Sequence, residues 1–420
     1  MYNKIRNLSK NKVLLNGTLF SLFSFINRGF SFLLLLILAN YILPKDYGYL
    51  SLFVTVSMVV GFFIALSTDG YLSVAFFKEG NDGVRQSVSS VLVISLVTSL
   101  LLFCVVFLFG TELSIVLELP LNVLYLVVSI SFFTVFSNMI LDYFRLREQV
   151  LLYGFFSCSN ALLNFLLSIA LVKYFSYGWQ GRIYAQLICC VLCGTIGIIF
   201  FWRHNLIVLP QKSFIKKIIV WGIPIIPHLA TNFVRQGCDR YIINYFHSLD
   251  DVGLFSFALN MANIIVMIGL GFNQSFSVDI YKVLGNSSLN SSCKTKTLSN
   301  QKKHVCFIYS VCSSVIAFCG YFFIPYFLPK YSCSRNYFLL LSIWAYLQCL
   351  YFLYTNFLFY FNKTRWIMYI TFSSSIIHLV LSLLLTRYSL YYSCLVYIVS
   401  QSIILLLVRY VSLKTLKKKL

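Results

Sequence analysis

The stretch that decides the fold is Trp221–Ser256, which reads WGIPIIPHLATNFVRQGCDRYIINYFHSLDDVGLFS. It places Arg235, Asp239 and Arg240 inside a long apolar span that also carries two prolines. A charged side chain is costly at the depth of a lipid bilayer, so an ionisable residue there is by default a candidate for a substrate or ion path. These three residues are therefore the first candidates for function.

The end of this stretch repeats a pattern from the first half of the chain. Asn-Tyr followed by Asp-x-Gly-x-x-Ser occurs at residues 40–51 and again at residues 244–256. Both copies fall at the junction between the first and second spans of a predicted six-span half. A half with an even number of spans begins and ends on the same side of the membrane. The pattern therefore indicates a transporter built from two parallel repeats.

The composition is that of an integral membrane protein. Of the 420 residues, 59% are hydrophobic and 11% are charged, and the mean hydropathy is +0.83. Soluble domains have about 25% charged residues. The apolar runs fit membrane helices of about 20 residues and are too long for the alternating strands of an outer-membrane barrel, which have about 10 residues. We predict about twelve spans, at residues 13–42, 48–68, 86–109, 121–141, 151–173, 183–202, 218–246, 252–277, 304–327, 337–361, 366–386 and 390–411.

The basic residues predict how these spans are oriented. Most of the 33 Lys and Arg residues fall on the side of the membrane that holds both termini. By the positive-inside rule that side is the cytoplasm. The net charge of +21 therefore reflects topology and contact with lipid headgroups, and it does not indicate a nucleic-acid partner. The first apolar run is too long for a cleavable signal, so we expect the first helix to be retained.

The loop at 203–217 separates two groups of six spans. We predict an all-α polytopic membrane protein with one six-helix bundle at 1–210 and a second at 211–420. At 1.5 Å per residue, spans 13–42 and 218–246 are longer than a hydrocarbon core about 30 Å thick. Each of them must therefore tilt, bend or protrude.

Charged residues inside the spans predict a substrate site. Arg28 lies mid-span in LFSFINRGFSFLLLL, where it should face a polar cavity or pair with a carboxylate such as Asp69. Arg235 and Asp239 are four residues apart, so they share a helix face and form either part of a site or a helix-locking ion pair. Arg240 then lies about 100° further round the helix. Two Arg for one Asp leave a positive balance, which suits an anionic group such as phosphate.

Two prolines predict a bend in the same span. Pro224 and Pro227 interrupt the backbone hydrogen bonds near its start, which is useful for a moving gate. His228 beside them is a candidate for proton coupling or a satisfied interior histidine. Asp69, which follows the second span, is a second candidate for coupling.

Signals for catalysis are absent from the sequence. It has no Gly-x-Ser-x-Gly, His-Glu-x-x-His or P-loop motif. The thirteen cysteines lie mostly in apolar spans without paired spacing or His partners, so we read them as small apolar side chains. We expect neither an enzyme nor a metal or cofactor site. Energy for transport would then come from an ion gradient, the substrate gradient or a partner.

Several motifs together resemble one transporter family. They are Gly222-Ile-Pro224-Ile-Ile-Pro227-His228, Asp239-Arg240, Val252-Gly253-x-Phe255-Ser256, Asn27-Arg28, Leu43-Pro44-x-Asp46-Tyr47-Gly48, and Phe272-x-x-Ser275-Phe276 before Tyr281-Lys282. In these features the chain resembles, from end to end, the O-antigen flippases of the Wzx type. These belong to the polysaccharide-transporter branch of the multidrug/oligosaccharidyl-lipid/polysaccharide exporter superfamily. One departure is visible: the family often has a proline where this chain reads SFSVDIYK, with Asp279.

The resemblance implies two six-helix bundles around a central cavity that opens alternately to each side. The implied activity is the flipping of undecaprenyl-pyrophosphate-linked O-antigen oligosaccharide units across the bacterial inner membrane, a step in lipopolysaccharide biosynthesis. Arg28, Arg235, Asp239 and Arg240 would then be cavity residues. The implied partners are the lipid-linked substrate, membrane lipids, an O-antigen polymerase and a chain-length regulator.

Two other functions stay open at this point. An ion-coupled exporter of small drugs would share the fold but would cause no glycan defect. An O-antigen polymerase or acyltransferase would need a large outer loop for its chemistry, and the longest loop here, at about 279–303, is predicted to be cytoplasmic.

Overall fold

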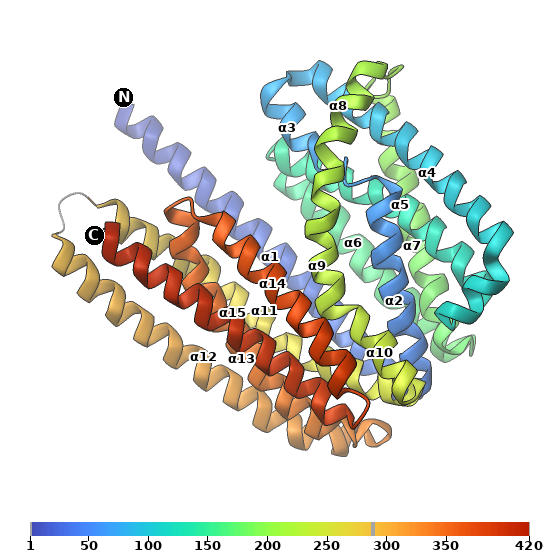
Figure 1. Cartoon of the computed structure of the whole chain (residues 1–420). Coiled ribbons are helices and arrows are strands. Elements are labelled where there is room, and N and C mark those ends of the chain that lie inside the picture. The colour runs from blue at the N-terminus through green and yellow to red at the C-terminus, as the bar shows by residue number, and fades with distance from the viewer. Residues whose placement is uncertain (1, 287–289, 420) are drawn as a thin grey trace. The chain divides into compact units, whose positions relative to one another are not determined.

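The computed structural model describes residues 2–286 and 290–419, without the side chains of residues 2–15, 17, 18, 21, 228, 232, 275 and 419. Within these ranges the chain forms helices joined by short turns, and it has no strand (Figure 1). Long apolar segments become helices because lipid offers no hydrogen-bond partner, and a helix satisfies its backbone groups internally. The predicted all-α fold is confirmed.

Twelve helical segments in the described ranges are long and apolar enough to cross a membrane, which confirms the predicted spans. The two spans that are longer than the hydrocarbon core differ in structure, because one is a continuous helix and the other is broken. The first lies in α1 (Tyr2–Tyr41), a helix of 40 residues that is longer than the predicted span. The seventh is broken into α8 (Lys212–Gly222), the short 3₁₀ helix η2 (Ile223–Ile225), α9 (Ile226–Gln236) and α10 (Cys238–Phe246).

The chain divides into two compact units. The first combines Met1–Ile42 with Leu52–Ala230, and the second combines Leu43–Ser51 with Thr231–Leu420. Both α2 (Pro44–Ile64) and α9 therefore have residues in each unit. The bundles at 1–210 and 211–420 stay a prediction.

The first unit is built around α5 (Leu121–Leu146), which contacts four neighbouring helices. These neighbours are α3 (Tyr71–Lys78), α4 (Gly80–Leu117), α6 (Val150–Ile169) and α7 (Gly178–Arg203). The π-helical segment η1 (Ala170–Tyr174) continues α6. Helix α1 packs on α6, where Asn27 Nδ2 donates a hydrogen bond of 2.8 Å to Ser157 Oγ. The start of α8 packs on α3 and α4.

The second unit is built around α13 (Ser334–Tyr360), which contacts α11 (Leu249–Gly285), α12 (Ser291–Phe327), α14 (Thr364–Leu385) and α15 (Leu390–Lys419). The 3₁₀ helix η3 (Pro329–Tyr331) links α12 to α13. In Figure 1, α12, α13 and α15 run side by side in orange to red. Helix α10 packs on α11, α14 and α15, so the end of the broken span belongs to this unit.

Both copies of the repeated motif begin a membrane helix, and their aspartates have the same local role. The Asp46 carboxylate accepts a hydrogen bond of 3.3 Å from the backbone N–H of Leu43, just before α2. The Asp251 carboxylate accepts one of 2.7 Å from the Ser248 hydroxyl, and that hydroxyl accepts from the Asp251 N–H at 3.2 Å. A carboxylate in the first turn also interacts favourably with the helix dipole. The repeat is therefore a repeated helix start.

The glycines of the two motifs bring these helix starts into contact within the second unit. A methyl group on Gly48 would overlap the carbonyl oxygen of Leu249, and one on Gly253 would overlap that of Pro44. A side-chain hydrogen bond also joins the two helices, because the Tyr47 hydroxyl accepts from Asn260 Nδ2 at 2.7 Å. The reciprocal pattern explains why both copies keep a glycine at this position.

We expect Gly253→Ala to destabilise the second unit by about 1–3 kcal/mol, because the added methyl group forces the two backbones apart. The measurement is the thermal unfolding temperature of the purified protein in detergent. The matched control is Gly271→Ala in the same helix, where an added methyl group meets no atom within 4 Å. Equal unfolding temperatures for the two variants would contradict the close-approach explanation.

Glu79 and its hydrogen-bond partners attach the start of the seventh span to other helices of the first unit. Glu79 Oε1 accepts hydrogen bonds from Lys217 Nζ of α8 at 2.7 Å and from the hydroxyl of Tyr71 at 2.5 Å. These two donors lower the pKa of the Glu79 carboxyl. The Trp221 ring packs edge-on against Tyr71 at 5.4 Å. Helix α8 thus contacts α3 through the charged pair with Glu79 and through the rings of Phe214 and Trp221, which both pack on Tyr71.

The contribution of Glu79 to stability should depend on pH. Its pKa is lower in the folded state, so its contribution is present above the ordinary carboxyl pKa of about 4.5 and is lost as the pH falls through the folded value. We expect Glu79→Gln to lower the unfolding temperature at pH 7, with a difference from the wild type that shrinks towards pH 4. A difference that does not change with pH would show that the carboxylate charge is unimportant.

Candidate functional site

The seventh span is interrupted twice, and both breaks lie near its charged residues. Pro224 lies in η2 and Pro227 lies in the first turn of α9. Proline has no backbone N–H and its ring clashes with the preceding turn, so the α-helical hydrogen bonds stop here. The second break is at Gly237, between α9 and α10. The structure thus has a break at the two prolines, and their role as a hinge stays a prediction.

Asp239 is the centre of a buried polar cluster in the second unit. It lies in the first turn of α10 and is 1% exposed. Its Oδ2 accepts a hydrogen bond of 2.8 Å from Nε2 of His378, and its Oδ1 accepts one from the hydroxyl of Ser382. His378 and Ser382 are one turn apart on α14, so both face the same carboxylate. The buried charge therefore has partners on both oxygens, as a low-dielectric environment requires.

The cluster continues onto α15. His378 Nδ1 lies 2.9 Å from the hydroxyl of Ser400, and that hydroxyl lies 3.2 Å from the carbonyl oxygen of Tyr397. The edge of the His378 ring meets the Tyr397 ring at 5.0 Å. Thr386 and Ser393 form a second hydroxyl pair at 2.9 Å, one turn along α14 from Ser382. Three helices are thus joined through hydrogen bonds between side chains.

The hydroxyl of Ser400 can serve His378 either as a donor or as an acceptor. With Nε2–H donated to Asp239, a neutral His378 accepts at Nδ1 from the Ser400 hydroxyl. A protonated His378 instead donates to that oxygen, and the hydroxyl turns to the Tyr397 carbonyl. Both charge states therefore keep their hydrogen bonds after one hydroxyl rotation.

The order Asp-His-Ser also resembles a catalytic triad, but Ser400 is 2% exposed and Asp239 is 1% exposed, so a substrate cannot reach the hydroxyl in this conformation. Among the described residues, no three His, Cys, Asp or Glu side chains gather as metal ligands.

The two arginines of the span lie on either side of the second break. Arg235 ends α9, is half-buried and donates a hydrogen bond of 2.7 Å to Gln401 Oε1 on α15. Arg240 is half-buried on α10, next to Asp239. Within the described residues, Arg235 and Asp239 form no ion pair with each other, so the alternative of a helix-locking pair is not seen. Each of these two residues instead has a partner on another helix.

Arg28 lies on the exposed side of α1. Its neighbour Asn27 bonds to α6, so Arg28 points away from that contact. Among the described residues Arg28 has no hydrogen-bond or ion-pair partner, and the alternative of a pair with Asp69 is therefore not seen. A guanidinium group at this depth needs a polar environment. A role in substrate binding stays a prediction.

The two candidates for coupling lie in the first unit. Asp69 is half-buried in the turn between α2 and α3, and its burial, together with the nearby charge of Asp142, raises the pKa of its carboxyl. The structure therefore makes Asp69 easier to protonate than an exposed aspartate. His228 lies in α9, and its side chain is outside the described part of the structure. Coupling by either residue stays a prediction.

Sequence reasoning missed the partners of this site. His378, Ser382, Ser400 and Gln401 come from α14 and α15, and His378 is 139 residues from Asp239. A usable signal was present in SIIHLVLS, where a histidine and two serines recur at helical spacing within an apolar span. That signal identifies a polar stripe on one helix but does not identify the carboxylate that it meets.

We expect His378→Leu to destabilise the protein by about 3–5 kcal/mol, because it leaves the Asp239 charge buried with one partner fewer. Asp239→Asn combined with His378→Leu should cost less than the sum of the two single changes. Thermal unfolding in detergent measures both effects, with His304→Leu on the exposed face of α12 as the control. Additive effects would mean that Asp239 and His378 are not coupled.

The fold is shared with known transporters. The lipid II flippase MurJ, in an inward closed conformation, superposes with a TM-score of 0.73 at 13% identity, over 96% of this chain and 90% of that chain. An inward-facing multidrug resistance transporter of the MATE family and MOP superfamily gives a TM-score of 0.71 at 14% identity, over 91% of this chain and 95% of that chain. At such low identity these similarities concern the fold.

Two curated relatives come from Haemophilus influenzae. One, described as an uncharacterized membrane protein, is 25% identical over 356 residues, which cover 83% of this chain and 84% of the relative. The other, described as Lsg locus putative protein 1, is 22% identical over 366 residues with the same coverage. The family described as polysaccharide biosynthesis protein matches residues 13–278, which include the repeat, the broken span and Asp239. This multi-pass membrane protein with a MATE- and MurJ-like fold therefore belongs to the polysaccharide biosynthesis protein family.

Proposed function

We propose that this protein is a flippase of the Wzx type. It carries undecaprenyl-pyrophosphate-linked O-antigen oligosaccharide units across the bacterial inner membrane by alternating access. The proposal is supported by membership of the polysaccharide biosynthesis protein family together with the fold of a lipid-substrate flippase. The expected partners are the lipid-linked substrate, an O-antigen polymerase and a chain-length regulator. In the proposed orientation both termini are cytoplasmic.

The observation that carries the proposed substrate class is the charge balance around α10. The carboxylate of Asp239 accepts hydrogen bonds from His378 and Ser382, and Arg235 donates one to the neutral side chain of Gln401. Asp239 supplies one negative charge against the two positive charges of Arg235 and Arg240, which leaves one positive charge in the span. A surplus of positive charge in a membrane-spanning helix favours an anionic group, and guanidinium binds phosphate oxygens in a bidentate way. Arg28, exposed in α1, is a further basic residue that we propose binds the substrate.

We assign Asp239 a second role beside the three arginines in the substrate site, because its partners also suit proton binding. In this proposal the Asp239–His378 pair is the energy-coupling element, and Asp69 and His228 are further candidates. Pro224 and Pro227 act as the hinge that lets α8 and α9 change their angle. Breaks of this kind are known sites of movement in transporter helices.

Export of small drugs is the second candidate function, because a MATE transporter shares the fold about equally well. Under this second function, deletion of the gene should make the cells drug-sensitive and leave their surface glycan unchanged. The arginine surplus favours the anionic substrate, because many exported drugs are themselves cations. A polymerase would require chemistry at an accessible site, and the Asp-His-Ser group is buried.

We expect Arg240→Ala or Arg28→Ala to reduce full-length surface polysaccharide roughly tenfold or more, since losing one hydrogen-bonded charge costs about 1.5–3 kcal/mol. The assay uses a strain that depends on this protein for its surface glycan, with variant protein levels measured by immunoblot. Arg240→Lys, which keeps the charge but loses the bidentate geometry, should fall between Arg240→Ala and the wild type.

Arg203→Ala is the matched control, because Arg203 is exposed at the end of α7. It should leave the polysaccharide unchanged. Full-length glycan in the Arg28→Ala and Arg240→Ala strains, at normal protein levels, would refute the role of these arginines. Normal glycan in the deletion strain, combined with new drug sensitivity, would replace the flippase by the exporter.

A further inference from the structure

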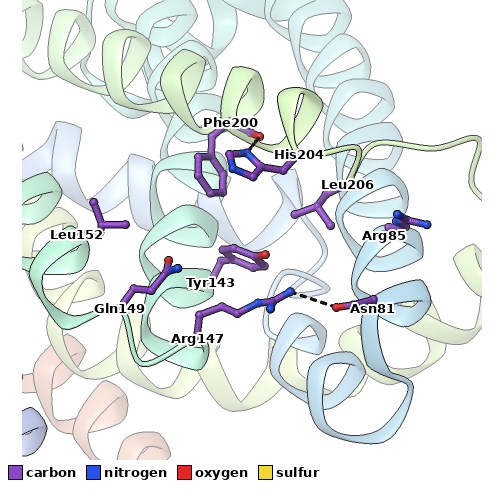
Figure 2. A pocket seen from close by; sticks show the side chains of 9 residues that line it. All are labelled: Asn81, Arg85, Tyr143, Arg147, Gln149, Leu152, Phe200, His204 and Leu206. Atoms are coloured by element: carbon purple, nitrogen blue, oxygen red, sulfur yellow. Dashed lines mark hydrogen bonds between the residues drawn. The ribbon is translucent and has the colours of Figure 1, made fainter.

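A cavity of about 420 Å³ lies in the first unit, where the turn between α5 and α6 meets the start of α4 and the end of α7 (Figure 2). Its lining includes the basic side chains Arg85, Arg147 and His204 together with the polar side chain of Asn81. None of these residues belongs to the proposed transport site. The cavity therefore needs an explanation of its own.

Arg147 is held in place by three neighbours. Its guanidinium group donates a hydrogen bond of 3.1 Å to Asn81 Oδ1 and lies 5.3 Å from the ring centre of Tyr143 and 5.6 Å from that of Phe76. In Figure 2 the side chain extends below Tyr143 towards Asn81. A guanidinium group has five N–H donors, so most of them remain for a ligand. Because its geometry is already fixed, little entropy is lost when a ligand binds.

Arg85 adds donors to the same cavity, and His204 forms part of its wall. Nδ1 of His204 lies 2.8 Å from the carbonyl oxygen of Phe200, so it carries the proton, and the ring packs on the Phe200 ring at 4.1 Å. Nε2 is then a hydrogen-bond acceptor and does not donate to a phosphate oxygen. Nε of Arg85 is buried without a hydrogen-bond partner. The ion pair of Arg85 with Asp82 spans 3.6 Å to a carboxylate that is 92% exposed, which is a weak interaction in water.

The surroundings of the cavity indicate a membrane lipid rather than a soluble ligand. Leu152 lines the cavity and is 49% exposed, and its neighbours Leu151 and Phe155 on α6 are more exposed still. Trp202, two residues before His204, is also exposed, and tryptophan concentrates at the level of the lipid headgroups. An acyl chain can thus lie along α6 while its headgroup enters the basic cavity.

We propose that this cavity binds the phosphate group of an anionic phospholipid, at the end of the first unit that carries the α5–α6 turn. Arg147 binds two phosphate oxygens, and Arg85 supplies further hydrogen bonds. The lipid would act as a resident ligand that joins four helix ends. This proposal does not depend on the identity of the transported substrate.

The test measures lipid binding to the purified protein by native mass spectrometry, supported by thermal unfolding. Phosphatidylglycerol and phosphatidylcholine with identical acyl chains are compared, together with free glycerol 3-phosphate. We expect phosphatidylglycerol to bind preferentially and to raise the unfolding temperature. Arg147→Gln should weaken this binding roughly tenfold or more, Arg85→Gln should weaken it too, and Arg147→Lys should fall between Arg147→Gln and the wild type.

Arg203→Gln is the matched control, because it removes one exposed positive charge next to His204 without altering the lining. It should bind phosphatidylglycerol like the wild type. Equal weakening by Arg203→Gln would mean general surface attraction and would overturn the site. Equal binding of the two phospholipids, or stabilisation by glycerol 3-phosphate at the same concentration, would overturn the assignment to an anionic lipid. Unfolding temperatures without added lipid identify any variant that is misfolded, and Arg147→Lys keeps the test valid in that case.

Discussion

The carboxylate of Asp239 is the group on which the arrangement of the second unit depends. A buried charge must find partners, and here His378 and Ser382 supply them from one face of α14. His378 in turn needs Ser400, which brings α15 into the cluster. These side-chain hydrogen bonds add specificity to helix packing that apolar contacts alone provide weakly in a membrane.

The second span of each half of the chain begins with the same helix-start motif. Asp46 and Asp251 stabilise the helix starts, and Gly48 and Gly253 let these starts approach closely. The seventh span is different because Pro224, Pro227 and Gly237 interrupt it. The seventh span is therefore divided into several helical segments. In membrane proteins such interruptions are tolerated only where protein or water satisfies the freed backbone groups.

Positive charge has three distinct uses in this chain. At the ends of the spans it supports the proposed orientation, and residues there account for most of the net charge of +21. In α9 and α10 it forms a surplus that Asp239 does not neutralise, which supports the proposed anionic substrate. Around the α5–α6 turn it lines a cavity in which Arg147 is fixed by aromatic rings. The depth of a basic residue and its neighbours decide its role, whereas the charge alone does not.

The spans, the break at the prolines and the repeat follow from local sequence, because hydropathy, proline chemistry and helix capping act over a few residues. The partners of Asp239 do not follow from it. His378 is 139 residues away, and helical spacing shows only that it shares a stripe with Ser382. Arg235 and Asp239 are four residues apart, yet each bonds to a side chain on another helix and not to the other. The sequence by itself thus determined which segments cross the membrane and where one of them breaks. Only the tertiary structure decided which side chains meet, because each buried charge takes its partners from whichever helices pack against it.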